Sequence, residues 1–255
     1  MAFLSVDRMF PRGAENPGEA RRKWRDFLEL AVGYGLILVV IWTPNPWQRR
    51  FYWISLVWII LATAFSFDGV KTMGLQLPGI WHSLWMVGVA LLTAVAAIVL
   101  AGRLHTLHQP HGFVPYIKRF WGYGLWAFAQ QFLLQDFFLL RLLRLLTSRM
   151  GAVIMAGALF AIAHLPNPLL SWAALIWGLA SCLLFLRHRN LYTLGMAHAI
   201  FGICIAVTIP AQVDHNMRVG HGYSTYHRPG PHRNHRDHTV STNVCVITAA
   251  PTRRS

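Results

Sequence analysis

Residues 157–168 read GALFAIAHLPNP and place His164 near the end of an apolar run. His198 lies in a second run, YTLGMAHAIFGICIAV at residues 192–207, and a third, WAFAQQFLLQDFFLL at residues 126–140, carries a polar cluster. Polar side chains are costly in hydrocarbon, so within apolar spans they usually face the interior of a helix bundle and mark a functional site. The three runs are about 33 residues apart. This spacing predicts polar groups that converge at one intramembrane site.

The composition is too apolar for an ordinary soluble domain. The chain is 55% hydrophobic and 13% charged, and its mean hydropathy is +0.41. Its apolar segments are each near the length that crosses about 30 Å of hydrocarbon. We therefore expect an all-α, polytopic transmembrane helix bundle of about seven spans (six to eight), at residues 27–43, 51–67, 81–100, 121–146, 151–164, 169–186 and 191–209.

The two ends of the chain differ from its middle. Residues 1–26 are polar and basic, which predicts a cytoplasmic arm before N-terminal transmembrane helices at 27–114 and a core at 115–210. Residues 211–255 are rich in His and Arg and are expected to be a disordered tail, so that deletion after about Gln212 would leave the membrane core folded. The predicted location is a bacterial-type inner (cytoplasmic) membrane, with the N-terminus in the cytoplasm.

The net charge of +14 predicts that the basic segments of the chain are attracted to the anionic lipid of the bilayer. The chain carries no recognisable nucleic-acid motif, so a nucleic-acid partner is not expected. The three cysteines match no metal motif, and the spacing of the histidines in the tail fits no closed zinc site. We therefore expect that no cofactor is required; zinc stays an alternative that the ligand spacing does not support.

Helical spacing relates the polar residues within each run. Gln131 and Gln135 are four residues apart and share a helix face, whereas Gln130 is about 100° away and Asp136 points elsewhere. Taken singly, a Gln or His in a transmembrane helix is often a residue that hydrogen-bonds to a neighbouring helix. The equal spacing of the three runs favours a shared site over that structural role.

The other two runs show the same kind of pairing. Phe160 and His164 share a helix face, and Asn167 follows Pro166, which should end that helix. One turn beyond His198 on the same face, a glycine at position 202 leaves room for the close approach of a helix or a substrate.

These residues resemble the three motifs of the CPBP family, the CAAX-protease and bacteriocin-processing (Abi) family of intramembrane endopeptidases. The family's motifs are a Glu-Glu pair followed by x-x-x-Arg, then Phe-x-x-x-His, then His-x-x-x-Asn, and the resemblance covers roughly residues 115–210. It implies that the Glu pair and the first His activate a water molecule, while the second His and the Asn stabilise the oxyanion. A glutamate-type mechanism without a required metal fits these motifs.

The chain departs from the family pattern at four positions. Gln130 and Gln131 replace the Glu pair, Gln135 replaces the Arg, and Gly202 replaces the Asn. A Gln amide hydrogen-bonds but has no titratable carboxylate, so it cannot act as a general base. The resemblance thus yields four candidate catalytic residues, His164, His198, Gln131 and Gln130, and four candidate substrate or cavity residues, Phe160, Asn167, Gln135 and Gly202.

Three functions remain open from the sequence. The chain is an active endopeptidase that cleaves a membrane-anchored or lipidated peptide, with His164 or His198 as base. Alternatively, it is a pseudoprotease that binds such a peptide without cutting it, or a membrane scaffold or transporter-like bundle. For the first two, Gln131, His164 and His198 are expected to face one cavity.

Overall fold

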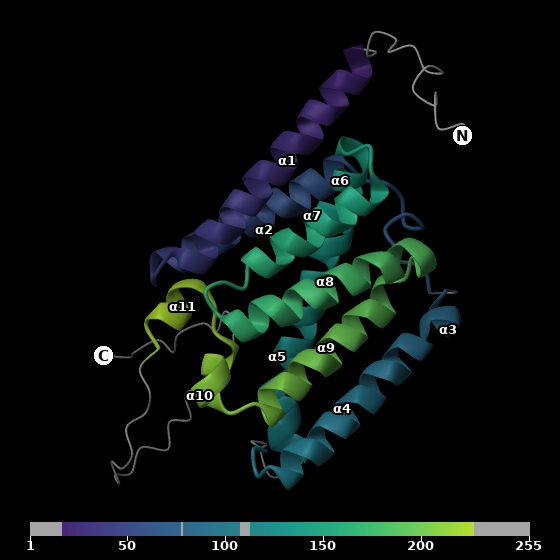
Figure 1. Cartoon of the computed structure of the whole chain (residues 1–255). Helices are drawn as coiled ribbons and strands as arrows, with labels where there is room; N and C mark the ends of the chain where they lie inside the picture. Colours follow the sequence, from purple (N-terminus) through teal and green to yellow (C-terminus); the bar gives the residue numbers. More distant parts are fainter. Residues whose placement is uncertain (1–16, 78, 108–112, 227–255) are drawn as a thin grey trace, which may run out of the picture.

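The predicted all-helical bundle is confirmed. The computed structural model describes residues 17–77, 79–107 and 113–226, and within these ranges every regular element is helical (Figure 1). The elements, in chain order, are α1 Pro17–Trp42, α2 Trp47–Phe65, α3 Ile80–Ser83, α4 Trp85–Arg103, α5 Phe113–Phe132, the π-helix η1 Leu133–Leu139, α6 Leu140–Leu145, α7 Arg149–Ile162, α8 Pro168–His188, α9 Leu191–Thr208, α10 Ala211–Asp214, the 3-10 helix η2 His215–Met217 and α11 Gly220–Ser224.

Three helices of the described chain are long and apolar enough to cross a membrane, namely Ile80–Arg103, Pro168–His188 and Leu191–Thr208. The seven apolar segments that the sequence singled out are all helical, and the number of about seven spans stays a prediction. Along α4, large apolar side chains such as Leu92 and Val99 are exposed. Such a surface suits contact with lipid.

The three helices around the two histidines begin at side-chain caps. Ser148, Asn167 and Asn190 precede α7, α8 and α9, and each side chain accepts a hydrogen bond from the backbone N–H three residues later. Such caps satisfy amide groups that a helix start leaves without a partner. At α8 the cap is followed by Pro168, whose fixed φ suits the first helical position. The local sequence thus sets where these helices start.

The predicted helix at 121–146 is a longer rod of three parts. It begins at Phe113 as α5, passes through η1 and continues as α6 to Leu145. A π-helix has more residues per turn than an α-helix and changes the phase of the helix that follows it. All side chains from Leu134 to Leu142 are buried, including Gln135 and Arg141, so this rod is the centre of the bundle.

The predicted arm at 1–26 needs correction. From Pro17 onward it is the first part of α1, and residues 1–16 lie outside the described residues. The carboxylates of Asp26 and Glu29 are buried, because they pair with arginines of α6. Residues 17–26 are therefore held against the bundle at their C-terminal end.

Buried ion pairs join α1 to α6. The Arg141 guanidinium donates to Glu29 Oε2 from Nε at 2.9 Å and from Nη2 at 2.8 Å. Arg144 binds Asp26 at 2.7 and 2.9 Å and Asp68 at 2.6 Å. A charge in an apolar interior is tolerated when it is paired and hydrogen-bonded. These contacts fix the middle part of α1 to the central rod.

The first part of the predicted disordered tail is folded. Residues 211–226 form α10, η2 and α11, and Met217 is buried. Gly220 has a φ of +53° and packs so closely on Ile41 of α1 that a Cβ atom there would overlap it. The predicted start of the disordered tail at residue 211 is too early, because the few apolar residues within 211–226 pack on the bundle. Residues 227–255 lie outside the described residues.

Deletion of residues 211–255 should destabilise the protein, contrary to the expectation from sequence. The loss should be at least the roughly 2–5 kcal/mol that a buried Met side chain contributes, because Met217 and the contact of Gly220 with Ile41 are removed. Deletion of 227–255 is the matched control, since it removes no described contact. Thermal unfolding in detergent, followed by tryptophan fluorescence, measures both. Equal melting temperatures for the two truncations would contradict the packing of 211–226.

Arg141→Met should lower the free energy of unfolding by about 3–5 kcal/mol, because it removes the closest and only buried cationic partner of Glu29 among the described residues and leaves this carboxylate with Ser66 and the half-exposed Arg25. The double variant Glu29→Gln with Arg141→Met should recover much of this loss, since no uncompensated charge remains. Arg149→Met changes an exposed arginine and serves as the control. A double variant no more stable than Arg141→Met would disprove the role of the pair.

Candidate active site

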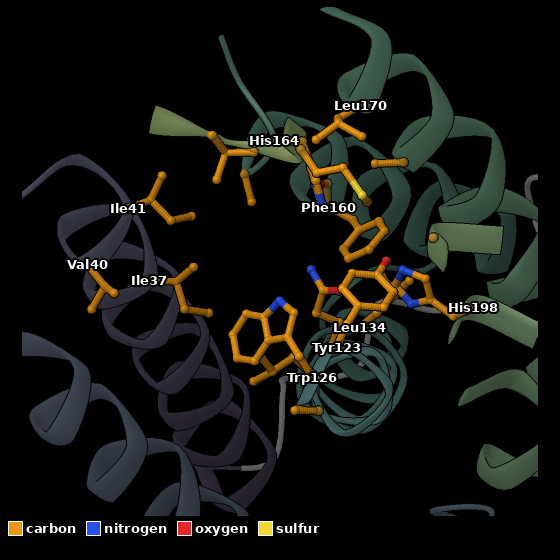
Figure 2. Close-up of a pocket in the computed structure, with 18 of the residues that line it drawn as sticks. Ile37, Val40, Ile41, Tyr123, Trp126, Leu134, Phe160, His164, Leu170 and His198 are labelled. Carbon is orange, nitrogen blue, oxygen red and sulfur yellow. The ribbon is translucent and has the colours of Figure 1, made fainter. Parts of the chain in front are cut away.

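A large cavity lies between α1 and the helices that carry the histidines. Its volume is about 2260 Å³, and residues of α1, α2, α5, α7, α8, α9 and the C-terminal segment line it. Figure 2 shows Ile37, Val40 and Ile41 of α1 across the open space from His164. The wall is mostly apolar, so its few polar side chains are the groups that could hydrogen-bond to a bound molecule.

His164 lines the cavity in the turn that follows α7. Its ring nitrogen Nδ1 lies 2.7 Å from the carbonyl oxygen of Phe160. A carbonyl oxygen only accepts hydrogen bonds, so Nδ1 carries the hydrogen and donates. In the neutral ring, Nε2 of His164 is then left with a free lone pair.

His198 lines the same cavity from α9, and its hydrogen-bond network assigns the opposite proton position. Its Nδ1 lies 3.1 Å from Nε2 of Gln131. The orientation of the Gln131 amide follows from its Oε1, which accepts from Gln135 Nε2 at 3.2 Å. Because an amide nitrogen only donates, Nδ1 of His198 accepts. The hydrogen of the neutral ring is therefore on Nε2.

The polar network continues behind the cavity wall. Gln135 Nε2 also donates to the hydroxyl of Ser181 on α8 at 3.1 Å, and Ser181 donates to the carbonyl of Gly178 at 3.2 Å. Gln131, Gln135 and Ser181 are fully buried. A buried polar group is costly unless it is paired, so this chain of hydrogen bonds holds His198 in one orientation.

Aromatic rings confine the two imidazoles. The Phe160 ring centroid lies 4.8 Å from that of His164 and 5.9 Å from that of His198, with edge-to-face geometry in both cases. Trp177 lies 6.1 Å from His198 on another side. Figure 2 shows the Phe160 ring between the two histidines. The rings limit the rotation of the imidazoles and restrict the access of water.

The structure divides the eight predicted site residues into two groups. Five line the cavity: Gln130, Phe160, His164, His198 and Gly202. The expectation that Gln131 faces the cavity is corrected, because Gln131 and Gln135 lie behind the wall in the polar network. Asn167 also lies away from the cavity wall, since its side chain caps α8 and donates to two backbone carbonyls of the C-terminal segment.

Tyr123 on α5 is a cavity residue that the motif-based reading missed. Its hydroxyl lies against Gly202, where a Cβ atom would overlap it, and Figure 2 shows the Tyr123 ring near His198. Tyr123 precedes Gln130 by seven residues, which places both on one helix face. This spacing in the sequence could have identified Tyr123 as a cavity residue. The absence of a side chain at Gly202 therefore makes room for the Tyr123 hydroxyl. The space that the sequence left for a helix or a substrate is filled by this tyrosine.

Among the described residues that line the cavity there is no Asp or Glu. Asp136 of η1 is buried outside the cavity, and neither of its carboxylate oxygens has a hydrogen-bond partner among the described residues. It is thus not placed to act on a group bound at the histidines. Within the described ranges, no group of three or more His, Cys, Asp or Glu side chains could hold a metal ion.

Comparison with known proteins agrees with the motifs. Residues 115–204, about a third of the chain, match the family described as type II CAAX prenyl endopeptidase Rce1-like. The match runs from α5 into α9. It includes five of the predicted polar site residues, namely Gln130, Gln131, Gln135, His164 and His198. No curated protein and no solved structure matches the chain. This match bears out the resemblance of this part of the chain to the CAAX-protease family, and the chain is an integral membrane protein.

Proposed function

We propose that the protein is an active intramembrane endopeptidase that cleaves a membrane-anchored or lipidated peptide, with His164 as the general base. The observation that carries this proposal is the opposite proton placement on two histidines at one cavity. His164 presents a lone pair, while His198 presents an N–H donor. Peptide hydrolysis needs one group of each kind.

The reaction follows from these two groups. Nε2 of His164 takes a proton from a water molecule as its oxygen attacks the peptide carbonyl. The N–H at Nε2 of His198 donates to the oxyanion that forms. The carbon–nitrogen bond then breaks, and the His164 imidazolium returns the proton to the leaving amine. The products are a carboxylic acid and an amine, and no metal is needed in this scheme.

The glutamines have positioning roles in this proposal. Gln131 cannot accept a proton, but its amide donates to His198 Nδ1 and keeps the ring's other nitrogen protonated. Gln135 orients Gln131 in turn. Gln130 lines the cavity and is placed to hydrogen-bond the substrate backbone or the attacking water.

The cavity suits a substrate with a long apolar group. Sites for small ligands usually measure about 300–1,000 Å³, whereas this cavity measures about 2260 Å³ and has a mostly apolar wall. An apolar anchor of a peptide fits along α1, with its peptide bond at the histidines. A bacterial-type inner membrane with a cytoplasmic N-terminus stays the proposed location.

One observation favours a second function. No carboxylate lines the cavity within the described ranges, and a neutral imidazole alone activates water less strongly than the family's Glu pair together with a His. Under this alternative the protein is a pseudoprotease, which binds the lipidated or membrane-anchored peptide in the same cavity and releases it uncut.

His164→Ala should lower the rate of cleavage by about 10²–10⁴-fold, as expected for loss of a general base. The assay uses purified protein in detergent and a panel of membrane-anchored and prenylated peptides, with products identified by mass spectrometry. His188→Ala, at the far end of α8, is the matched control and should retain wild-type activity.

Gln131→Glu separates the two functions in the same assay. An inactive wild type with activity in Gln131→Glu would establish a pseudoprotease with an intact cavity. Cleavage that persists in His164→Ala would exclude His164 as the base.

Gly202→Ala should abolish cleavage and lower thermal stability, because its Cβ atom would overlap the Tyr123 hydroxyl. The double variant Gly202→Ala with Tyr123→Ala should regain stability, since the smaller side chain removes the overlap. Gly124→Ala is the control, as no heavy atom lies within 4 Å of a Cβ atom built there. If Gly202→Ala is as stable as wild type, the close contact of Tyr123 with Gly202 is wrong.

A further inference from the structure

A second groove lies between the start of α7 and the end of α8, and it is separate from the cavity of the histidines. The two helices pack side by side (Figure 1). The groove has a volume of about 530 Å³, and the described residues that line it are Arg149, Met150, Val153, Leu183, Leu186 and Arg187. None of these residues lines the larger cavity. The groove has no part in the proposed hydrolysis, so its role has to come from its own chemistry.

The shape of the groove follows from the packing of α7 on α8. A Cβ atom at Gly178 of α8 would lie 3.2 Å from the Cα atom of Gly157 of α7, so the two backbones meet at this level. Closer to the start of α7, the side chain of Met150 is 54% exposed and that of Leu183 is 46% exposed, whereas Val153 is buried. Val153 therefore forms the floor of the groove, and the two exposed side chains form apolar sides that suit contact with lipid.

The groove lies where the apolar stretch of α8 ends. The helix Pro168–His188 is long and apolar enough to cross a membrane, and Arg187 is in its last turn. Arg149 is the first residue of α7. Arginines at the ends of apolar helices extend to the level of the lipid headgroups. Val153 and Leu183 each lie one helical turn from one of these arginines, which places them at the level of the acyl chains.

The positive charge at the groove is not balanced within the described part of the chain. Arg149 and Arg187 are exposed, and neither forms an ion pair with a described residue. Arg189, by contrast, donates to a backbone carbonyl before α3 at 3.1 Å. Burial lowers the pKa of the Arg189 guanidinium, and the charge of Arg149 lowers it further. Among the described acids, only Asp136 opposes this effect, and it is buried within the bundle.

We propose that this groove binds one anionic glycerophospholipid, with the phosphate on Arg149 and Arg187 and an acyl chain along Val153 and Leu183. Guanidinium groups form charge-assisted hydrogen bonds with phosphate oxygens. A zwitterionic lipid carries its own cation, so two unmatched arginines favour a headgroup with a net negative charge. The bound lipid joins the start of α7 to the end of α8. This inference does not depend on the proposed function.

The affinity of the full-length protein for single lipids tests the site. Native mass spectrometry of the protein in detergent, titrated with phosphatidylglycerol or with phosphatidylcholine of the same acyl chains, gives the dissociation constant of each one-to-one complex. The double variant Arg149→Gln with Arg187→Gln should bind phosphatidylglycerol about ten- to thirtyfold more weakly than wild type, as expected for the loss of two basic side chains at a lipid headgroup. Wild type should bind phosphatidylcholine more weakly than phosphatidylglycerol.

Arg49→Gln with Arg50→Gln is the matched control, because it removes two exposed arginines at the start of α2 that do not line the groove. This control should keep the wild-type affinity for phosphatidylglycerol. Thermal unfolding verifies that both double variants are folded. An equal loss of affinity in the two double variants would show that net charge alone attracts the lipid, and it would overturn the proposal.

Leu183→Trp tests the apolar part of the site, because it keeps both arginines and fills the groove with a larger side chain. It should lower the affinity for phosphatidylglycerol severalfold. Glycerol 3-phosphate, which has the phosphate but no acyl chain, should not displace the bound lipid. The proposal is overturned by equal affinity of wild type for the two lipids, by unchanged binding in Leu183→Trp or in the Arg149 and Arg187 double variant, or by displacement with glycerol 3-phosphate.

Discussion

The hydrogen bond between Gln131 and His198 is the interaction on which the site depends. In a bundle surrounded by hydrocarbon, an unpaired amide costs more free energy than a typical hydrogen bond gains. The chain from Ser181 through Gln135 and Gln131 to His198 pairs both amide nitrogens and joins α8, η1, α5 and α9, while Oε1 of Gln135 is left without a partner among the described residues. One network therefore sets both the packing of four helices and the position of a proton on His198.

α1 bounds one side of the cavity and is held to the bundle at several points. At its midpoint, Glu29 is bound by Arg141 of α6, and five residues later the Tyr34 hydroxyl donates to the Leu159 carbonyl of α7 at 3.0 Å. Near its C-terminal end, Ile41 packs on Gly220. Between these contacts, α1 presents apolar side chains to the open space (Figure 2).

The replacement of a Glu pair by two glutamines changes the chemistry and leaves the architecture of the site coherent. An amide keeps the hydrogen-bonding shape of a carboxylate but neither its charge nor its basicity. No described residue of the cavity wall is an acid, so the proposed function assigns the role of base to His164.

The sequence by itself determined the helices and the family, because apolar runs of about twenty residues, Asn and Ser caps and Pro breaks are local signals. It also brought His164 and His198 together through their spacing. Only the tertiary structure decided that Gln131 lies behind the wall, that Tyr123 occupies the space beside Gly202, and that the segment around Arg218 folds onto the cavity. These contacts join residues far apart in the chain, and helical periodicity carries no information about which distant side chain fills a given space.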